Sequence, residues 1–483
     1  MHYNIFQTYE RLWLDMSVNI FEQNSLTWMP KRKTLKRPIY KALVNRMEND
    51  VNEGILLPGT KLPSQRELAD FLDINFTTVT RAYKLSEQLG LTYGLIGKGT
   101  YIAQTANKTI SISSLYKDSL FELGLNSSFE QCNNMLNTTV ADVANKSSLE
   151  SLLNYKNAVG TVFQRQVALN YLVKLGIKTK IDNIAITSGG QNALTIILLG
   201  LFNPNDRIAV DRFTYANFIE LAKMINIKLV PIDFDSEGMR PEYLDKACKN
   251  SDLHGIYLMT GCSNPTGIRM SEKRCRLLAE VIKKNKLIVI EDDYLGFIGM
   301  GKENKMVKLS SLLPDQSVYI CSMSKPVATG LRVGYLVFPD DYRQALQQSL
   351  CNINVKTSSL DAEIITQALL NGSAYKIMHK KIQLALKANT IFSNIFVAEQ
   401  TKHKNIPAFI KWLPLKKNNI GAEAIESLLL ANGIRVFHSD RFLAGPKIKH
   451  EFLRISLSAT KTIELLEPAL MKLKIVLEEQ NLI

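Results

Sequence analysis

The sequence predicts an α/β protein in two unequal parts: a small N-terminal helical part with a hairpin, and a large part built on a mostly parallel sheet. Residues 38–103 show helical apolar spacing broken by turn signals, and they end in two β-rich runs around a Gly-Lys-Gly turn. From about residue 155 to 338, helical patterns alternate with short apolar runs such as RIAVD (207–211) and LIVIED (287–292). This alternation is typical of a mostly parallel sheet covered by helices.

The composition of the 483-residue chain excludes several classes of protein. At roughly 100–200 residues per domain, we expect two to four domains. The net charge of +14 favours polyanionic partners without choosing among them. The longest apolar runs, such as ALTIILLGLF (193–202), are too short to span a bilayer, and residues 1–16 lack the apolar core of a signal peptide. We therefore expect a cytoplasmic protein with no membrane partner.

The six cysteines give no sign of a disulfide framework or a metal centre. None are paired as CxxC, and none stand at zinc-ligand spacing with the six histidines. We interpret them as reduced thiols and expect no bound metal.

The N-terminal part begins with an extension over residues 1–37 that has no firm pattern. Within it, the basic run KRKTLKR (31–37) is either a solvated lead-in or an arm that contacts phosphates. A first helix is then predicted from apolar residues at helical spacing, namely Ile39, Leu43, Met47 and Val51. It ends at Gly54, beyond which Pro58-Gly59 marks a turn.

Two further helices and a hairpin follow. Ser64 and Glu67 stand at the spacing of a capping box, so a second helix is predicted to begin after Ser64. A third helix covers residues 77–90, and residues 91–103 supply the hairpin. The core of this part is predicted to contain Leu68, Phe71, Leu72, Val79 and Leu85.

The rest of the chain divides by composition. Residues 105–150 are rich in Ser, Asn and Thr, and we predict a linker with some local helix. Residues 151–340 form the large parallel-sheet domain, and residues 341–483 a long helix with a small α/β lobe. The helical part then occupies residues 38–104.

Three motifs occur together in residues 38–104: LPSQRELA (62–69), TTVTRAY (77–83) and GKGTY (97–101). In this combination they resemble the winged helix-turn-helix of GntR-type bacterial regulators. Such a module places a recognition helix in the major groove of double-stranded DNA. The residues expected to contact an operator are Arg66, Thr77, Thr78, Arg81 and Lys98.

Each of these side chains has a chemical reason to meet DNA. Arg66 begins the second helix and can reach a phosphate or a guanine. The hydroxyls and free N–H groups at Thr77 and Thr78 can meet a phosphate, and Arg81 projects one turn later. Lys98 has glycine on each side, which lets the wing approach the minor groove.

Phe76 departs from the pattern of this family, which usually has an arginine just before the paired threonines. Three interpretations stay open. Phe76 packs locally, or it contacts a thymine methyl group, or its presence changes operator preference or weakens binding.

Lys325 is the candidate centre of chemistry in the large part. It ends the motif CSMSK (321–325) after a predicted strand, and GLRVGY (330–335) follows, with Arg332 seven residues after the lysine. This pattern resembles fold-type I aminotransferases, which depend on pyridoxal 5'-phosphate. The resemblance implies that Lys325 carries the cofactor as an aldimine, while Ser322 and Arg332 hold the phosphate.

The other positions that such a site needs occur in the matching order. An acid must face the pyridine nitrogen, a ring must stack on the cofactor, and donors must reach its phenolic oxygen and phosphate. The resemblance assigns these roles to Asp292 (nitrogen), Tyr215 (stacking), Asn264 and Tyr294 (phenolic oxygen), and Gly190 and Gln191 at a glycine-rich helix start (phosphate). The choice of Asp292 over the neighbouring Asp293 rests on the resemblance alone.

Arg454 is the candidate clamp for a small-molecule effector. It lies in FLRISL (452–457), which resembles the aminotransferase motif whose arginine binds the substrate α-carboxylate, and a structural ion pair is the alternative. In relatives that sense γ-aminobutyrate, a further arginine stands two residues after the stacking tyrosine. This chain has Asn217 there, so a γ-amino acid is disfavoured.

From about Pro38 to its end, the chain resembles the MocR subfamily of bacterial regulators, in which these two modules are fused. The resemblance implies a head-to-tail homodimer that binds DNA and senses pyridoxal phosphate, or an amine or amino acid that reacts with it. A ligand changes DNA affinity only if it binds two states of the protein differently. Two alternatives stay open: a working aminotransferase, and a sensor of the vitamin itself that controls its synthesis or salvage.

Overall fold

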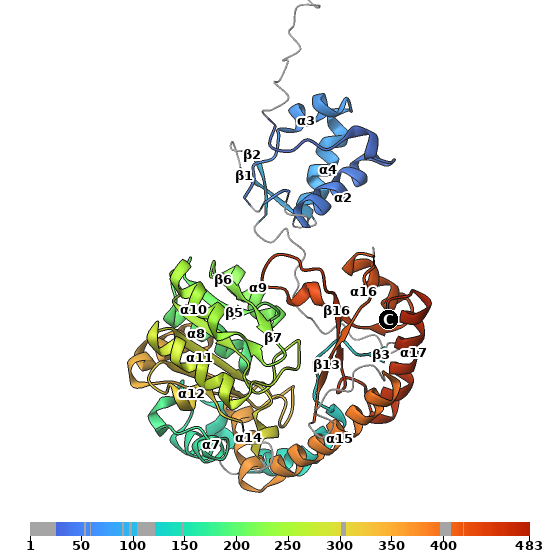
Figure 1. The fold of residues 1–483 in the computed structure, drawn as a ribbon. Helices are drawn as coiled ribbons and strands as arrows, with labels where there is room; N and C mark the ends of the chain where they lie inside the picture. Colours follow the sequence, from blue (N-terminus) through green and yellow to red (C-terminus); the bar gives the residue numbers. More distant parts are fainter. Residues whose placement is uncertain are drawn as a thin grey trace, which may run out of the picture. The chain divides into compact units, whose positions relative to one another are not determined.

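The computed structural model describes residues 26–52, 55–57, 59–88, 91–95, 99–103, 121–146, 149–155, 157–300, 306–396, 407–418 and 420–483. The chain divides into two compact units, Met1–Thr109 and Ile110–Ile483 (Figure 1).

The N-terminal unit contains the predicted helices and hairpin. Its elements are η1 (Arg32–Thr34), α2 (Ile39–Asn52), α3 (Gln65–Leu72), α4 (Phe76–Gln88) and the antiparallel strands β1 (Thr92–Leu95) and β2 (Gly99–Ile102). The capping box before α3 is confirmed. The Ser64 hydroxyl accepts a hydrogen bond from the Glu67 N–H at 3.2 Å, and the Glu67 carboxylate accepts one from the Ser64 N–H at 2.7 Å.

The core of this unit lies where the three helices meet the hairpin. Of the predicted core side chains, Leu68, Leu72 and Val79 are buried there and Leu85 is half-buried. The apolar residues Leu43, Met47 and Val51 of α2 are buried in the same core. The prediction for Phe71 was wrong, because its side chain is 40% exposed. The short helix α3 buries one narrow face, made by Leu68, Ala69 and Leu72, and position 71 falls outside it.

Part of the predicted extension belongs to this unit. Trp28 and Leu35 are buried in its core. The indole Nε1 of Trp28 donates to Asp50 Oδ2 at 2.7 Å, and Asp50 also pairs with Arg46 at 2.5 Å. Trp28 thus anchors this part of the extension to α2, whereas residues 1–25 lie outside the described residues.

The large unit is built on a seven-stranded sheet in the order β4-β12-β11-β10-β9-β5-β6. Strand β12 is antiparallel to both neighbours and the remaining pairs are parallel. The bounds are β4 (Ile184–Thr187), β5 (Arg207–Asp211), β6 (Lys228–Ile232), β9 (Gly255–Leu258), β10 (Ile288–Asp293), β11 (Ser317–Ser322) and β12 (Gly334–Val337). The predicted mostly parallel sheet is therefore confirmed, strand by strand.

Helices cover both faces of this sheet, as strands that are buried along their whole length require. One face packs against α8 (Gly190–Leu201), α9 (Ala216–Met224) and α13 (Arg343–Asn354). The other packs against α10 (Pro241–Asn250), α11 (Glu272–Lys284) and α12 (Leu309–Leu312). The two-stranded pair β7 (Phe234–Asp235) and β8 (Gly238–Met239) leads into α10 (Figure 1).

The predicted long helix and small lobe form the C-terminal part of the same unit. After α14 (Ser359–Leu370), the long helix α15 (Ser373–Ile395) leads to a three-stranded sheet in the order β13-β16-β15 (Figure 1). Its strands are β13 (Ile410–Pro414), β15 (Phe437–His438) and β16 (Phe452–Ser456), flanked by α16 (Ala422–Ala431) and α17 (Leu466–Glu479).

Much of the predicted linker is instead an integral part of the large unit. Strand β3 (Phe121–Glu122) pairs in parallel with β14 (Ile434–Arg435) of the lobe. It is followed by η2 (Glu130–Leu136), α5 (Asn137–Ala144), α6 (Leu149–Leu153) and α7 (Val162–Lys174). Although the segment is mostly polar, four of its apolar side chains are buried in the core of the large unit: Leu123, Phe129, Cys132 and Leu136. Residues 104–120 lie outside the described residues.

Within the described residues, we find no helix whose length and apolar character would let it cross a bilayer.

Candidate cofactor site and DNA-binding surface

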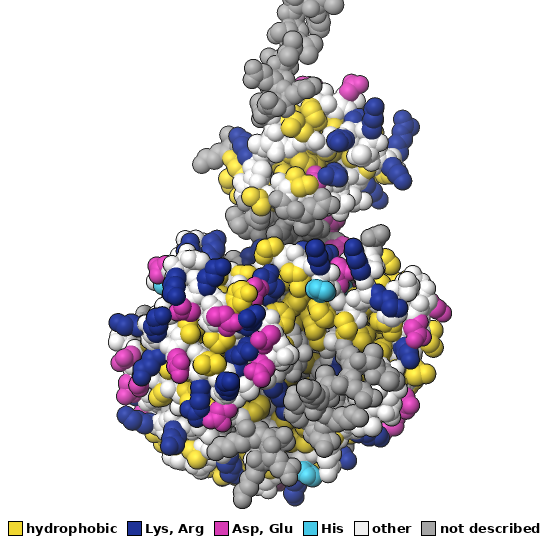
Figure 2. Space-filling view, in the orientation of Figure 1, with side chains coloured by type: hydrophobic (Ala, Val, Ile, Leu, Met, Phe, Trp, Pro, Cys, Tyr) yellow, Lys and Arg dark blue, Asp and Glu magenta, His cyan; other side chains and the backbone are white. Residues whose placement is uncertain are grey.

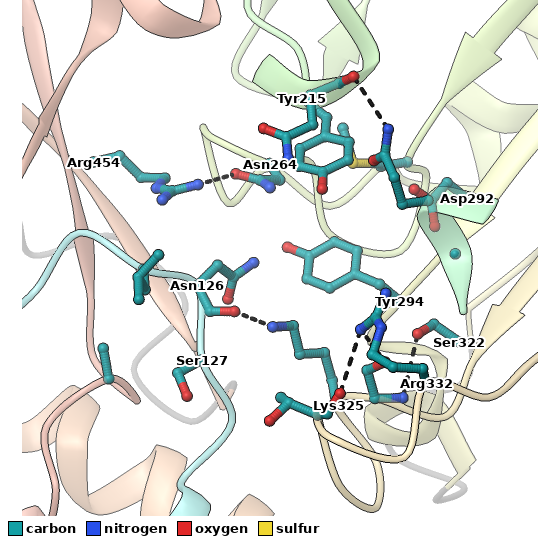
Figure 3. Close-up of a pocket in the computed structure, with 18 of the residues that line it drawn as sticks. Asn126, Ser127, Tyr215, Asn264, Asp292, Tyr294, Ser322, Lys325, Arg332 and Arg454 are labelled. Carbon is teal, nitrogen blue, oxygen red and sulfur yellow. Dashed lines mark hydrogen bonds between the residues drawn. The ribbon is translucent and has the colours of Figure 1, made fainter. Parts of the chain in front are cut away.

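A cavity of about 440 Å³ lies in the large unit, between the carboxyl ends of the central strands and the small lobe. The structure brings every cofactor and effector residue named from the sequence to its wall (Figure 3). These residues are Gly190, Gln191, Tyr215, Asn264, Asp292, Tyr294, Ser322, Lys325, Arg332 and Arg454. Open α/β sheets place ligands at this edge.

Strand β10 separates its two terminal acids onto opposite faces. Asp292 lines the cavity and accepts a hydrogen bond from the hydroxyl of Tyr257 at 3.0 Å. Burial raises the pKa of Asp292 to about 7. Asp293 points away: it accepts from the Tyr319 hydroxyl at 2.6 Å and pairs with Lys308 at 2.5 Å. Of the two candidates, only Asp292 can face a ligand in the cavity.

Lys325 follows β11, and its side chain points across the cavity toward Asn126, whose backbone carbonyl accepts a hydrogen bond from its Nζ (Figure 3). Burial lowers the pKa of the Lys325 amine to about 7, and the positive charges of Lys381, Arg454 and Arg332 act in the same direction. The amine therefore has a large uncharged fraction near neutral pH.

A cradle for an anion lies beside Lys325, where α8 begins. Arg332 Nη1 donates to the Ser324 hydroxyl at 3.1 Å, which holds the guanidinium near Gly189. Gly189 has φ +87°, and a Cβ atom on it would lie 2.7 Å from Arg332 Nη2. Only glycine allows the arginine to approach the helix start so closely, and a helix N-terminus with an arginine favours phosphate.

Arg454 is a fully buried cation on β16. Its Nη1 donates to Asn264 Oδ1 at 2.9 Å and its Nη2 to the Gly124 carbonyl. The ring centroids of Phe442 and Phe437 lie 4.7 and 5.6 Å from its guanidinium carbon. Burial lowers its pKa to about 10, so it stays charged at neutral pH. Among the described residues, it makes no ion pair with a carboxylate, which disfavours the structural alternative.

Sequence reasoning missed the contribution of the predicted linker to this cavity. Glu122, Asn126, Ser127 and Glu130 all line it. No motif identified them, because a short polar segment carries no period, and they reach the cavity only through the distant pairing of β3 with β14. Asn217 also lines the cavity, and its carbonyl accepts a hydrogen bond from Gln191 Nε2 at 3.3 Å.

The candidate DNA-binding side chains of the N-terminal unit lie on its surface. Arg66, Thr77 and Arg81 are exposed and Thr78 is half-buried, whereas Lys98 lies outside the described residues. Asn75 Oδ1 accepts hydrogen bonds from the N–H and the hydroxyl of Thr77, both at 2.8 Å, which fixes the start of α4. Figure 2 shows Lys and Arg side chains gathered along one edge of this unit.

Phe76 is the first residue of α4, and its ring is 45% exposed. The interpretation that Phe76 packs locally is therefore disfavoured. Arg81 lies further along the same helix with its guanidinium 4.4 Å from the ring centroid of Tyr40. The candidate recognition helix thus exposes the Phe76 ring and an Arg81 guanidinium that stacks on Tyr40.

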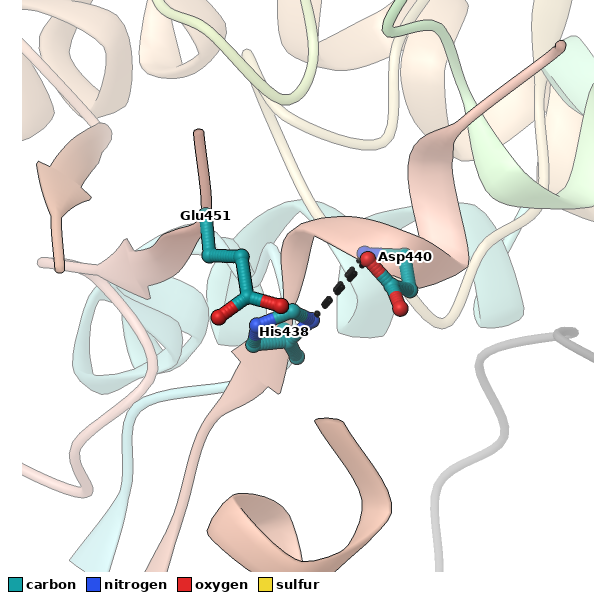
Figure 4. Close-up of side chains that lie close together, drawn as sticks. All are labelled: His438, Asp440 and Glu451. Carbon is teal, nitrogen blue, oxygen red and sulfur yellow. Dashed lines mark hydrogen bonds and ion pairs between the residues drawn. The ribbon is translucent and has the colours of Figure 1, made fainter. Parts of the chain in front are cut away.

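A separate cluster in the small lobe has the residue types of a metal site (Figure 4). His438 is fully buried, and its Nδ1 accepts a hydrogen bond from the Asp440 N–H at 3.2 Å. The Lys447 ammonium lies 3.2 Å from a carboxylate oxygen of Asp440 and 3.2 Å from one of Glu451. Since Lys447 already supplies the positive charge between the two acids, we interpret the cluster as an internal ion-pair network.

The fold and the two sites define a composite class of protein, a winged helix-turn-helix regulator joined to an aminotransferase-like domain. The chain belongs to the aminotransferase class I and II family, whose model matches residues 124–473, and residues 39–102 match the gntR family of bacterial regulatory proteins. It is a GntR-type transcriptional regulator fused to an aminotransferase domain, an arrangement that agrees with MocR-type regulators.

Relatives support this assignment over the full length. The chain is 33% identical over 472 residues to the uncharacterized HTH-type transcriptional regulator YdeF of Bacillus subtilis (strain 168), covering 96% of this chain and 100% of YdeF. The large unit is similar to an archaeal alanine:glyoxylate aminotransferase, with a TM-score of 0.69 and 20% identity over 75% of this chain and 91% of that one. It is similar to a kynurenine aminotransferase of Pyrococcus horikoshii solved with PMP, with a TM-score of 0.68 and 20% identity over 75% and 92% of the two chains. At this identity, the structural likeness shows the fold.

The cofactor of this aminotransferase family is pyridoxal phosphate, and the cavity fits it. The cofactor needs an amine, an acid and an anion site. The cavity offers the Lys325 amine with a pKa of about 7, the buried Asp292, and the arginine cradle that excludes a Cβ at Gly189.

Proposed function

We propose that this regulator holds pyridoxal phosphate on Lys325 and that its affinity for DNA depends on the cofactor, or on an amine or amino acid that reacts with it. The observation that carries the proposal is a single cavity that joins a buried amine, a buried acid and two arginines. An uncharged amine beside an anion cradle is what covalent capture of a phosphorylated aldehyde requires.

When bound, pyridoxal phosphate supplies an aldehyde that reacts with amines and a ring that accepts electrons. Asp292, which lines the cavity, would hold a proton at the pyridine nitrogen. Lys325 would supply the amine that reacts with the aldehyde. The remaining roles are stacking by Tyr215, hydrogen bonds from Asn264 and Tyr294 to the phenolic oxygen, and phosphate binding by Gly190, Gln191, Ser322 and Arg332.

Arg454 binds the carboxylate of the effector. It stays charged in a water-poor wall, and it lies beside Asn264 rather than beside an acid. A buried cation whose partners are neutral gains most from an incoming anion. An α-amino acid therefore suits the site, because its amine reaches the cofactor while its carboxylate reaches Arg454.

Segment 121–130 couples the cavity to the rest of the chain. The Asn126 carbonyl accepts a hydrogen bond from Lys325 Nζ, and the Gly124 carbonyl accepts one from Arg454 Nη2. A ligand that engages Lys325 and Arg454 competes with both bonds. A ligand that displaces these two bonds would favour a second arrangement of this segment, and a difference in binding energy between the two arrangements would change DNA affinity.

On the DNA side, Arg66, Thr77, Thr78, Arg81 and Lys98 contact the operator. Arg81 and Lys98 supply charge to the backbone or base edges, and the start of α4 offers hydroxyl and N–H donors. We further propose a head-to-tail homodimer, which reads two half-sites, and a cytoplasmic location where DNA is available. A single mass of about 54.4 kDa in light scattering would contradict the dimer.

The absorption spectrum of the purified protein, with pyridoxal phosphate added and the excess removed, tests the cofactor assignment. We expect a visible band in the wild type that is absent from Lys325→Ala. The same spectrum in the two proteins would contradict the assignment. Operator binding is then measured with the cofactor alone and with added amines.

A working aminotransferase is a second candidate, favoured by the presence of every catalytic position in one cavity. Steady formation of a keto acid by purified protein would support it. An operator affinity that responds to pyridoxal phosphate without any amine would instead indicate a sensor of the vitamin.

A further inference from the structure

A buried lysine outside the cavity wall lies directly beneath Lys325. Lys381 sits in the middle of α15, at a position where its helical neighbours Met378 and Ala385 belong to the apolar core. Its side chain is fully buried. Lysine is almost never buried in this way unless its ammonium is bonded, so its surroundings require an explanation.

The ammonium of Lys381 uses all three of its donors on neutral oxygens. It donates to the Ser128 hydroxyl at 2.9 Å, to the backbone carbonyl of Lys325 at 2.9 Å and to that of Val327 at 2.8 Å. The Ser128 hydroxyl in turn donates to the Lys325 carbonyl. One side chain thus joins the long helix, the turn that bears Lys325, and the segment that follows β3.

Lys381 holds the backbone of Lys325, while the segment that contains Ser128 holds its side-chain end. The backbone carbonyl of Lys325 accepts from Lys381 and Ser128, while its own Nζ reaches Asn126, two residues before Ser128. Among the described residues, Lys381 makes no ion pair. Burial lowers the pKa of its ammonium to about 8, while Cys132 and Glu130 act in the opposite direction, so most of it stays charged at pH 7. That charge acts on the Lys325 amine through a water-poor interior, where Coulomb interactions are strong.

We propose that Lys381 is a positioning residue for the cofactor lysine: it fixes the Lys325 turn against segment 126–128 and brings a buried positive charge to that turn. This inference rests on the proposed role of Lys325. The uncharged amine is the form that reacts: its nitrogen forms a C=N bond with an aldehyde carbon, and the aldehyde oxygen leaves as water with the two amine protons.

The groups that face Lys325 set the direction of the effect. Besides burial, Lys381 contributes the largest charge effect that lowers the pKa of the amine, Arg454 and Arg332 follow, and Glu130 opposes them. Removing the charge of Lys381 therefore raises the pKa of Lys325. Lys381→Arg keeps the charge, and Lys380→Met, on the exposed neighbour, is the matched control.

The test is the rate at which cofactor-free protein captures pyridoxal phosphate as a function of pH, followed by visible absorption. The wild type reaches its half-maximal rate near the pKa of Lys325, about 7. In Lys381→Met, we expect this midpoint to rise by about one unit, which slows capture at pH 7 about fivefold. Lys380→Met and Lys381→Arg keep the wild-type midpoint. Ser128→Ala, which removes one anchor without changing charge, lowers cofactor occupancy but leaves the midpoint in place.

An unchanged midpoint in folded Lys381→Met would overturn the inference, as would a shift of equal size in Lys380→Met. If Lys381→Met does not fold, Lys381→Gln gives the same comparison, since it removes the charge and keeps donors. Lys325→Ala in the same series separates the two proposals. If the visible band persists in Lys325→Ala, the proposed role of Lys325 is refuted. If the band is lost in Lys325→Ala but the pH midpoint of Lys381→Met equals that of the wild type, only the proposed role of Lys381 is refuted.

Discussion

The substitution Gly189→Ala tests the anion cradle at the start of α8. The new Cβ would lie 2.7 Å from Arg332 Nη2 and 3.1 Å from its Cζ, so the guanidinium must move away from the helix N-terminus. The arginine is flexible and can move at small cost to folding, but the phosphate then loses charge-assisted hydrogen bonds worth about 1.5–3 kcal/mol. We therefore expect the dissociation constant for pyridoxal phosphate to rise about 10- to 150-fold.

The backbone strain of this variant needs its own control. Alanine at a positive φ is strained wherever it stands, by roughly 1–3 kcal/mol. Gly176 has φ +86°, close to the +87° of Gly189, but nothing lies within 4 Å of the place that a Cβ atom on it would occupy. Gly176→Ala thus places an alanine at the same positive φ without displacing Arg332, and the unfolding curves compare the strain in the two variants. The assay is titration of each variant with pyridoxal phosphate, monitored by absorption, beside a thermal unfolding curve. Equal cofactor affinity in the two variants would refute the assignment of the cradle.

Four further substitutions separate the roles of individual side chains. Arg454→Met should keep the cofactor band but weaken the apparent affinity for an α-amino acid, followed by its spectral response, by at least about tenfold. The apparent affinity for an amine that lacks a carboxylate should not change. An equal effect of the substitution on both ligands would contradict the role of Arg454 as a carboxylate clamp. Asp292→Asn should weaken cofactor binding. Asp293→Asn leaves Lys308 buried without its partner, so it should instead lower the free energy of unfolding by about 3–5 kcal/mol in a denaturant titration. The reverse pattern would exchange the two roles. If Phe76 contacts a thymine methyl group, replacing that thymine by uracil should weaken operator binding by the wild type by about 1 kcal/mol. The same replacement should not weaken binding by Phe76→Ala. A wild type that binds every such uracil operator equally well would leave changed or weakened operator preference as the explanation.

The sequence predicted the features that local patterns encode. The short apolar runs between helices, such as RIAVD and LIVIED, form strands of the seven-stranded sheet, and Ser64 and Glu67 form a capping box. Both features depend on residues that are close together in the chain. The motifs around Lys325 and Arg454 led to residues that share one cavity. These motifs carried the site because strand ends in an open α/β sheet converge on one edge.

Features that depend on distant contacts were not predictable. Residues 121–146 have the composition of a polar linker, yet β3 pairs with β14 more than three hundred residues later. Lys381 looks like any helix surface lysine until α15 is placed beneath Lys325. The resemblance alone chose Asp292 over Asp293, and the geometry of β10 supplies the physical reason, since adjacent strand residues face opposite sides. Phe71 was assigned to the core because α3 is too short to show which apolar positions form its buried face.

The central claim is that chemistry at Lys325 changes DNA affinity. The most direct test is the dissociation constant for operator DNA, at one fixed salt concentration, for wild type and Lys325→Ala, with no ligand, with pyridoxal phosphate, and with the cofactor plus a panel of amino acids. The account predicts that at least one condition changes the affinity of the wild type by about 5- to 150-fold and that Lys325→Ala does not respond. Equal affinity of the wild type under every condition, or an equal response in Lys325→Ala, would contradict it.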